Sequence, residues 1–338
     1  MSHLNKNKKN ILLIGGCGFI GHNLALHLNA HGHNVSVIDS FNVNNLGEVM
    51  SRPDTTLNKS LYLKFLWARQ DLLQKAGIRI SAIDARNYID MNKTIDSVQP
   101  DCIIHLAAVA HANKSNKDPY RTFDHSMRTL ENALDCARGN VPHFIYFSSS
   151  MVYGNFQTAV VTEKTECNPI GIYGALKFGG EKLVMAYNQV FNLKYTIIRP
   201  SALYGARCIS QRVVQRFIEC ALTNSPLEIT GNSAHKLDFT YIKDLCDGVE
   251  KTILCPRALN ETFNLTFGQG RSIQELVNII KTRFPDVKVK YNEEDMLTPE
   301  RGTLSIEKAK TILDYKPKYN LESGIYNYLD FYNNFDRA

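Results

Sequence analysis

Residues 10–21 read Asn-Ile-Leu-Leu-Ile-Gly-Gly-Cys-Gly-Phe-Ile-Gly, and they decide the fold that we expect for this chain of 338 residues. The run from Asn10 to Ile14 predicts a strand, the glycines predict a tight turn, and a helical pattern follows from Phe19 to about His31. In such a unit the amide groups at the helix N-terminus can face a pyrophosphate, with no Cβ in the way. A tight turn with a purely structural role is the alternative.

The next strand strengthens the ligand-binding interpretation. It runs from Val35 to Asp39 and ends in an acid 18 residues after Gly21. A carboxylate at this place accepts a hydrogen bond from a ribose 2′-OH and repels a 2′-phosphate, so the pattern favours NAD over NADP. An exposed acid at a strand end is the alternative.

Strands and helices continue to alternate through the first 200 residues. Further strands are predicted at 78–83, 102–105 and 144–147, and helices at 61–75, 119–137 and 172–191. This alternation predicts an α/β fold of the Rossmann type, with a doubly wound parallel sheet. We expect the only tryptophan, Trp67, and His105 to be core residues, His105 with its hydrogen bonds satisfied, and His111 to lie in a loop.

Polar side chains gather where the predicted fifth strand ends. Serines occupy positions 148–150, and Tyr173 opens a helix that also carries Lys177. Residues at i and i+4 lie on one helical face, about 5 to 6 Å apart at Cβ, so the ammonium of Lys177 can favour the phenolate of Tyr173. A polar loop beside a chance Tyr-x-x-x-Lys pair is the alternative.

Composition excludes several classes of protein. The net charge of +6 includes Lys6, Lys8 and Lys9, and the remaining excess suits an anionic small substrate better than a nucleic acid. Eight scattered cysteines without a CxxC predict reduced thiols and no metal site. The polar first ten residues and the absence of a long apolar run predict a cytoplasmic protein without a membrane partner.

These motifs, in this order, resemble the extended short-chain dehydrogenase/reductase family, especially its nucleotide-sugar epimerases and dehydratases. The matching segments cover nearly the whole chain: GGCGFIG at 15–21, IDS at 38–40, HLAA at 105–108, SSSMVYG at 148–154, YGALK at 173–177, RPSALYG at 199–205, LDFTYIKD at 237–244 and ERGT at 300–303. The resemblance implies an NAD-binding domain at 8–199 plus about 236–258. A smaller α+β domain, at 200–235 plus about 259–336, would bind a nucleotide sugar.

The resemblance also implies roles for individual residues. Tyr173 would be the general base and acid, Lys177 would hold the nicotinamide ribose and lower the pKa of Tyr173, and Ser149, or else Ser150, would bind the reacting oxygen. The implied cofactor-binding residues are Gly15, Gly18, Phe19, Ile20, Asp39, Asp84, Ala85, Leu106, Ala107, Ala108, Tyr173 and Lys177. Arg301 would meet a nucleotide phosphate, since its planar fork suits bidentate binding.

The chain departs from the family pattern around the substrate. Ala202 and His125 replace common asparagines, Leu237 replaces a common arginine, and Arg128 replaces a common glycine. The sugar therefore cannot be inferred from the commonest relatives. Arg207 and Arg212 are further candidates for binding an anionic part of the substrate, although a helix at 212–222 could equally carry such arginines on its solvent-facing side.

The residues after Ser149 bear on the reaction. Relatives that dehydrate their substrate carry Asp-Glu there, and relatives that decarboxylate it carry Glu two positions on, whereas this chain has Ser150 and Met151. We therefore expect NAD-dependent C4 epimerisation of a nucleotide sugar, with UDP as the nucleotide that the resemblance implies. The segment between Asp39 and Asp84 is similar to that of UDP-glucuronate 4-epimerases and favours an acidic hexose.

Other functions are compatible with the same fold and motifs. The protein could be a dehydratase, a ketosugar reductase, or a cofactor-binding protein without activity. In many relatives the helices that correspond to 119–137 and 172–191 form a dimer interface, which implies a homodimer.

Overall fold

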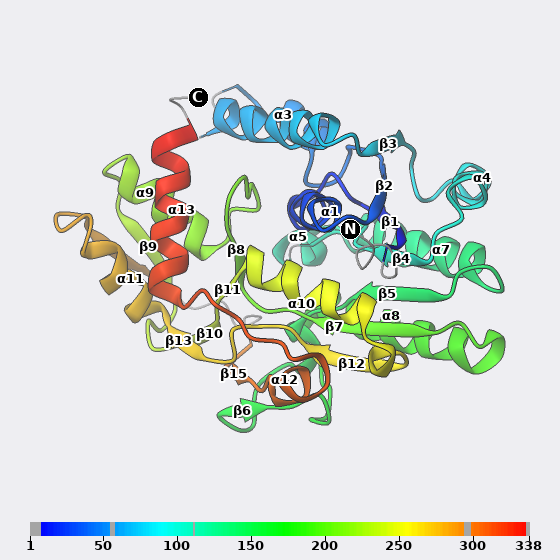
Figure 1. The fold of residues 1–338 in the computed structure, drawn as a ribbon. Helices are drawn as coiled ribbons and strands as arrows, with labels where there is room; N and C mark the ends of the chain where they lie inside the picture. Colours follow the sequence, from blue (N-terminus) through cyan, green and yellow to red (C-terminus); the bar gives the residue numbers. More distant parts are fainter. Residues whose placement is uncertain (1–7, 55–57, 111, 294–298, 336–338) are drawn as a thin grey trace, which may run out of the picture.

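A parallel sheet forms the centre of the computed structural model, which describes residues 8–54, 58–110, 112–293 and 299–335 (Figure 1). Within these residues the sheet has seven strands in the order β12-β7-β5-β4-β1-β2-β3, and every pairing is parallel. The strands are β1 Asn10–Ile14, β2 Asn34–Asp39, β3 Arg79–Ala82, β4 Cys102–His105, β5 His143–Phe147, β7 Tyr195–Arg199 and β12 Glu261–Asn264. The predicted Rossmann-type α/β class is confirmed.

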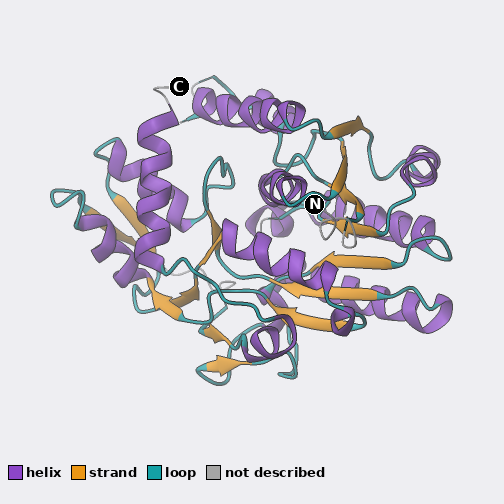
Figure 2. Cartoon of the chain, in the orientation of Figure 1, coloured by secondary structure: helices purple, strands orange, loops and turns teal. Residues whose placement is uncertain are grey.

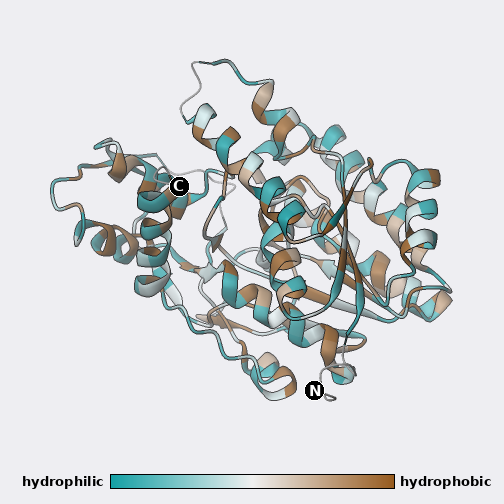
Figure 3. Cartoon of the chain, turned by 45° about the horizontal axis from the view of Figure 1, so that its top comes forward, coloured by the Kyte–Doolittle hydropathy of each residue, from teal (hydrophilic) through white to brown (hydrophobic). Residues whose placement is uncertain are grey.

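Helices cover both faces of this sheet (Figure 2). On β1 the side chains alternate: Ile11 and Leu13 share a core with α1 and α10, whereas Leu12 and Ile14 share a core with α4 and α7. In Figure 3 apolar residues gather along the central strands, whereas the covering helices carry both polar and apolar residues. The covering helices are α1 Phe19–Ala30, α4 Tyr88–Val98, α7 Thr129–Ala137, α8 Gly171–Phe191 and α10 Ile242–Leu254.

The strand order reverses between β1 and β4, and the loops that follow these two strands close on each other. The Leu106 amide donates to the Ile14 carbonyl at 2.8 Å, and Gly15 has a φ of +85°. A Cβ on Gly15 would lie 2.8 Å from the Ala107 nitrogen, so only glycine permits this approach. The switch point of a doubly wound sheet is where ligands bind.

A smaller lobe packs beside the carboxyl ends of the strands. Its core combines residues of α9, α11 and α13 with Tyr62, Phe65 and Leu66 from α3. Trp67 lies on the opposite side of α3 and is 57% exposed, so the expectation that it is a core residue is wrong. The elements of this region are α3 Lys59–Lys75, α9 Val213–Leu222, α11 Ile273–Lys281, α13 Leu321–Phe335, β9 Leu227–Thr230, β10 Lys236–Asp238, β13 Gly270–Ser272 and β14 Val289–Asn292.

The predicted domain division needs one correction. Residues 261–264 were assigned to the smaller domain, but they form β12, which pairs with β7 as the outermost strand of the central sheet. The sequence does not predict this strand because it is short and lacks an apolar run. Only Phe263 and Asn264 are fully buried in it. The rest of the proposed division stays a prediction.

Short elements complete the described chain. The helix expected at 119–137 is helical throughout but contains a π-helical turn, η1 Asp124–Arg128, between α6 Pro119–Phe123 and α7. The others are α2 Leu46–Met50, α5 Ala112–Lys117, α12 Glu307–Leu313, η2 Ser150–Tyr153, η3 Pro256–Ala258, β6 Val160–Val161, β8 Leu203–Tyr204, β11 Thr240–Tyr241 and β15 Thr303–Leu304. Among the described helices, no stretch has the length and apolar character needed to cross a bilayer.

Candidate active site

A cavity opens at the switch point between β1 and β4. All ten residues that were predicted to contact only the cofactor line it: Gly15, Gly18, Phe19, Ile20, Asp39, Asp84, Ala85, Leu106, Ala107 and Ala108. Sequence reasoning missed Arg69 and Thr129, which also line this cavity, because they enter from helices on either side of the strand ends. His125, which the sequence analysis placed near the substrate, lines this cavity and is not among the residues lining the second one. We call this space the cofactor cavity.

The glycine turn and the start of α1 form one end of the cofactor cavity. Gly18 is the N-cap of α1, and no side chain caps this end of the helix. The first amide groups of a helix have no partner within it, and they carry a partial positive charge. This end of the cavity therefore fits a pyrophosphate, because backbone donors stand where Gly15 and Gly18 leave no side chain in the way.

Asp39 closes the next part of the cavity. Its carboxylate accepts hydrogen bonds from the backbone amides of Cys17 at 2.9 Å and Phe41 at 2.8 Å. Burial raises the pKa of Asp39, and these hydrogen bonds oppose that rise. Each carboxylate oxygen has a second lone pair, so Asp39 can still accept from ribose hydroxyls.

Asp84 stands on the same wall, held by an arginine that the sequence analysis did not identify. The guanidinium of Arg86 donates to both carboxylate oxygens, with Nε at 3.0 Å from Oδ1 and Nη2 at 2.6 Å from Oδ2. Its Nη1 donates to Asp124 at 2.5 Å. These hydrogen bonds lower the pKa of Asp84, so a fixed carboxylate faces the cavity.

A second cavity adjoins the first. It is lined by the serines at 148–150, by Tyr173 and Lys177 of α8, and by Ala202, Arg212, Leu237 and Arg301. Both cavities are lined by Ile20, Leu106, Ala108, Ala110, Leu203 and Arg212. The two spaces therefore adjoin along these residues, and we call the second one the substrate cavity.

Lys177 is buried at the bottom of the substrate cavity. Its Nζ donates to the Phe147 carbonyl at 2.7 Å and lies 5.2 Å from the centre of the Tyr146 ring. Burial lowers the pKa of Lys177 to about 8, although the charge of Glu181 opposes this fall. Tyr173 lies one helical turn earlier, so the phenol and the ammonium line the same cavity.

Ser149 is brought beside Tyr173 by close packing between α8 and η2. A Cβ on Gly174 would lie 2.9 Å from the Met151 carbonyl oxygen, so glycine allows α8 to lie against the serine segment. Ser149 caps η2, and its Oγ accepts from the Met151 amide at 3.2 Å. Its hydroxyl proton remains available to a ligand in the cavity.

A buried ion pair lies next to the serine segment and Lys177. The Arg199 guanidinium donates twice to Glu181, at 2.8 and 2.6 Å, and Ser148 donates to the same carboxylate at 2.5 Å. Arg199 also donates to the hydroxyl of Tyr153 at 3.0 Å. The ends of β5 and β7 are thereby tied to α8, one turn beyond Lys177.

Two of the three predicted substrate arginines reach the substrate cavity. Arg212 donates to the Ala110 carbonyl at 2.9 Å, and the buried Nε of Arg301 has no partner in the described part of the chain. Burial lowers the pKa of Arg301 to about 10, and the nearby charge of Arg212 adds to the effect. No carboxylate side chain is among the described residues that line this cavity. An anionic ligand would balance the two guanidinium groups.

Arg207 faces elsewhere. It lines neither cavity. Its Nε donates to Nε2 of His22 on α1 at 3.1 Å, and its guanidinium lies 5.6 Å from the centre of the Phe331 ring on α13. The structure therefore gives no support to its predicted role in substrate binding, because packing between the two lobes uses this side chain.

Two histidines complete the comparison with the sequence analysis. His105 is buried in the core as expected, but neither ring nitrogen has a hydrogen-bond partner in the described structure, so the expectation of a satisfied histidine is wrong. Burial, with a contribution from Lys177, lowers its pKa to about 3, which keeps the ring neutral. The predicted loop residue His111 lies outside the described residues.

A glycine cradle at a switch point, together with a Ser, Tyr and Lys set in an adjoining cavity, defines a dinucleotide-dependent enzyme of the short-chain dehydrogenase/reductase type. The model of the NAD dependent epimerase/dehydratase family matches residues 11–266. The chain belongs to this family, and NAD is its cofactor.

Individual relatives agree with this assignment. The chain is 29% identical over 324 residues to an uncharacterized UDP-glucose epimerase, YtcB, of Bacillus subtilis strain 168, covering 94% of this chain and 96% of that protein. It is 25% identical over 318 residues to a UDP-glucuronate 4-epimerase of Thermodesulfobacterium geofontis, covering 93% of each.

Solved structures support the fold. The UDP-glucuronic acid 4-epimerase of Bacillus cereus, in complex with UDP-glucuronic acid and NAD, superposes with a TM-score of 0.84. The superposition covers 96% of this chain and 99% of that one, at 24% sequence identity. At this identity the likeness concerns the fold.

Proposed function

We propose that the protein is an NAD-dependent C4 epimerase of a UDP-linked hexose, with Tyr173 as the base and acid. The single observation that carries this proposal is the composition of the substrate cavity. It combines Ser149, Tyr173 and Lys177 with two arginines, and no carboxylate is among its described lining residues. Proton transfer by Tyr173 is therefore the chemistry that these side chains can supply.

The proposed mechanism assigns each side chain one task. Tyr173 removes the proton from the C4 hydroxyl, and the Ser149 hydroxyl donates a hydrogen bond to the same oxygen. NAD, which Gly15, Gly18 and Asp39 would hold, would supply the acceptor and the donor for the C4 hydride. After the 4-keto sugar has turned over in the cavity, Tyr173 returns the proton to the oxygen.

Lys177 acts on both partners of this reaction. Its ammonium lies on the same helical face as Tyr173, so its positive charge favours the phenolate. The hydrogen bond to the Phe147 carbonyl leaves two of its three N–H groups for a ribose hydroxyl or the phenol. Removal of Lys177 would therefore impair both cofactor orientation and proton transfer.

A dehydratase or a decarboxylase is the weaker alternative. Elimination of water needs an acid and a base beside the sugar ring, in addition to the group that transfers the C4 proton. Ser150 and Met151 occupy the positions where the corresponding relatives carry these acids, and both line the substrate cavity. Epimerisation needs no such group, because Tyr173 takes up and returns the same proton.

The arginines support a nucleoside diphosphate as the activating group. Arg212 and Arg301 raise the positive potential of a cavity in which the buried Nε of Arg301 has no partner among the described residues. A guanidinium fork matches two phosphate oxygens, and a diphosphate supplies the charge that the cavity lacks. We propose that Arg301 holds the diphosphate and that Arg212 lies nearer the sugar, where both cavities meet.

Turnover of a substrate panel tests the proposal. The purified protein is incubated in D2O with UDP-glucose, UDP-glucuronate and UDP-N-acetylglucosamine, and the products are resolved by NMR. We expect a C4 epimer that keeps its original hydrogen at C4, without net formation of NADH. A product that lacks water, deuterium at C5, or stoichiometric NADH would contradict the proposal.

We also propose that the protein is a homodimer that pairs through α6, α7 and α8. In support, large apolar side chains are exposed on this surface, with Tyr120 87% and Phe123 53% exposed. Light scattering should give twice the chain mass of 38.2 kDa, and Tyr120→Asp should shift the mass towards that of one chain. A mass of one chain for the unaltered protein would contradict a dimer.

A further inference from the structure

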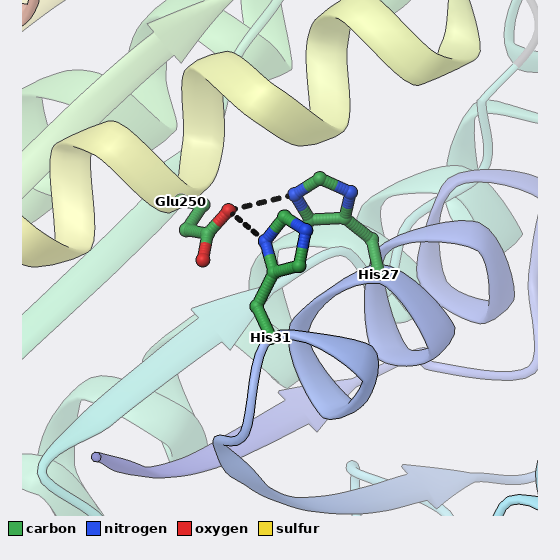
Figure 4. A group of neighbouring side chains, drawn as sticks. All are labelled: His27, His31 and Glu250. Atoms are coloured by element: carbon green, nitrogen blue, oxygen red, sulfur yellow. Dashed lines mark hydrogen bonds and ion pairs between the residues drawn. The ribbon is translucent and has the colours of Figure 1, made fainter. Parts of the chain in front are cut away.

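A cluster of histidine and carboxylate side chains joins α1 to α10, away from both cavities (Figure 4). His27 and His31 stand one turn apart near the end of α1, and both point at Glu250 of α10. Oε2 of Glu250 lies 2.8 Å from Nε2 of His27 and 2.6 Å from Nδ1 of His31. Three side chains from two helices thus present one atom each to a common point.

A fourth residue orients the carboxylate. Nδ1 of His33 accepts from the Lys9 amide at 3.3 Å, so the proton of the neutral ring is on Nε2. That nitrogen lies 3.4 Å from Oε1 of Glu250. His33 therefore holds one carboxylate oxygen and leaves the other one facing His27 and His31, as the outer partners of metal ligands do.

Glu250 is ionised in this arrangement. An unperturbed glutamate carboxyl has a pKa of about 4.3, well below neutral pH. The carboxylate therefore offers a negative oxygen at neutral pH. Ring nitrogens of neutral imidazoles would complete a ligand set of two nitrogens and one oxygen.

We propose that His27, His31 and Glu250 form a binding site for a zinc ion that clamps α1 against α10. The three ligand atoms lie within 4.8 Å of one another. In a tetrahedral zinc site, nitrogen and oxygen ligands lie about 2.0 to 2.2 Å from the metal, so ligands sit on the order of 3.3 Å apart. Small side-chain rotations reach that geometry, most easily for His31, whose side chain is 49% exposed, and water would fill the fourth position.

The nature of the ligands selects the ion. Imidazole nitrogens suit zinc and its neighbours in the first transition row, whereas Mg²⁺ and Ca²⁺ prefer oxygen ligands alone. A hydrogen-bonded cluster without metal is the competing interpretation, since each imidazole can donate a proton to Oε2. The two interpretations differ in whether zinc displaces these protons and raises stability.

The site would act on the fold rather than on the reaction. His31 lies 12 residues beyond Phe19 on α1, which corresponds to roughly 18 Å along the helix axis. The other end of the same helix faces the cofactor cavity. A metal at this distance contacts no reacting group, but it would fix the helix that presents its N-terminus to the cofactor. The sequence predicted no metal site because its cysteines lack metal-ligand spacing. The pair His27 and His31 gains a third ligand only from Glu250, which is 219 residues from His31.

Zinc titration of the tag-free protein, freed of metal with a chelator, tests the proposal. Calorimetry at pH 7.5 should show one zinc ion bound per chain with a dissociation constant of 10 μM or lower. The melting temperature should rise by several degrees at saturating zinc, since a ligand that binds only the folded state stabilises it. Substitution of Co²⁺ for zinc should produce the visible absorption of a nitrogen- and oxygen-bound ion.

Variants separate this site from other metal-binding groups. His31→Ala and Glu250→Gln should each weaken zinc binding at least tenfold and abolish the rise in melting temperature, whereas His235→Ala should bind zinc as the unaltered protein does. Melting in chelator compares the folding of the variants directly. Absence of zinc binding at 100 μM, or an unchanged zinc-induced rise in either cluster variant, would overturn the proposal. The absence of a Co²⁺ spectrum in the unaltered protein would overturn it independently of any variant.

Discussion

The cofactor cavity and the substrate cavity share a wall but are built on different principles. The cofactor cavity is formed by backbone and small residues at the ends of neighbouring strands, and its fixed charges include the carboxylates of Asp39 and Asp84. In the substrate cavity, the charged groups on the described lining are cations, namely Lys177, Arg212 and Arg301. Arg69 and Arg212 also line the cofactor cavity, so the difference lies in the carboxylate acceptors, which are present there and absent from the described lining of the substrate cavity.

The cofactor cavity follows from the topology of the sheet, whereas the substrate cavity depends on individual side chains. Strand ends and a helix N-terminus follow from the topology, so a dinucleotide site arises wherever this sheet forms. Long side chains such as Arg212 come from segments distant in sequence, and each can turn to either side of its backbone. The specificity of the enzyme therefore depends on the orientation of a few side chains.

Removal of the Tyr173 hydroxyl from the substrate cavity should have the largest effect. In our proposal Tyr173→Phe deletes the only proton-transfer group on the substrate side, so kcat should fall about 10³-fold. NAD affinity, measured by calorimetry, should change less than threefold, because the cofactor cavity is otherwise intact. Kinetics with the preferred UDP-sugar provide the measurement.

Tyr187→Phe is the matched control, because Tyr187 lies on the same helix and its ring packs at a tilt against Phe191, with the ring centres 5.3 Å apart. It should keep full activity. If Tyr173→Phe turned over substrate at a rate close to that of the unaltered enzyme, the proposed mechanism would be discarded.

The buried ammonium of Lys177 should make the stability of the protein depend on pH. Because burial lowers the pKa of Lys177 from 10.5 to about 8, the folded cofactor-free protein binds fewer protons than the unfolded chain between these pH values. Its free energy of unfolding should therefore rise with pH across this window and lose that contribution as the pH falls through 8. The rise relative to Lys177→Met should reach up to about 3 kcal/mol.

Urea denaturation at pH 8.0 and 10.5 measures this difference. Lys182→Met, which removes an exposed lysine from the same helix, should follow the unaltered protein at both values. A free-energy difference between the unaltered protein and Lys177→Met that stays constant with pH would show that Lys177 is not forced towards its neutral form.

Substitutions in the two cavities should each weaken the binding of a different ligand. Arg301→Gln removes a guanidinium from the substrate cavity and should raise KM for the UDP-sugar about 30-fold, because a charged hydrogen bond contributes about 2 kcal/mol. Asp39→Asn should weaken NAD binding about tenfold and leave that KM unchanged. Steady-state kinetics and calorimetry on the same preparations measure both. If either variant affected both ligands equally, the two cavities would not be functionally separate.

Sequence reasoning succeeded for the features that follow from the topology and failed for the orientation of single side chains. The glycine turn, Asp39 and Ala107 could be predicted because each stands at a strand end, and parallel strands bring their carboxyl ends to one edge. The same reasoning found Ser149 and Tyr173, since their segments return to that edge. The Arg86 clamp on Asp84 remained hidden, because nothing in the sequence distinguishes a side chain that folds back two residues from one that points to solvent.

Long-range packing accounts for the rest. The sequence could not tell Arg207 from Arg212, since both follow the same motif, and packing against Phe331 decides which one leaves the substrate cavity. Residues 261–264 gave no clear strand signal, yet their pairing with β7 completes the sheet. In each case the deciding partner lies more than sixty residues away in the sequence.

Arg207 provides the smallest and most discriminating test. Because its guanidinium contacts His22 and Phe331 and lines neither cavity, Arg207→Lys should leave KM for the UDP-sugar within threefold of the original value. The loss of a partly buried stacking contact, on the order of 1 kcal/mol, should lower the melting temperature by a few degrees. Arg212→Lys, five residues further along, should do the reverse, with a raised KM and a nearly unchanged melting temperature. A tenfold rise in KM for Arg207→Lys at constant melting temperature would return Arg207 to the substrate and remove the distinction between the two arginines.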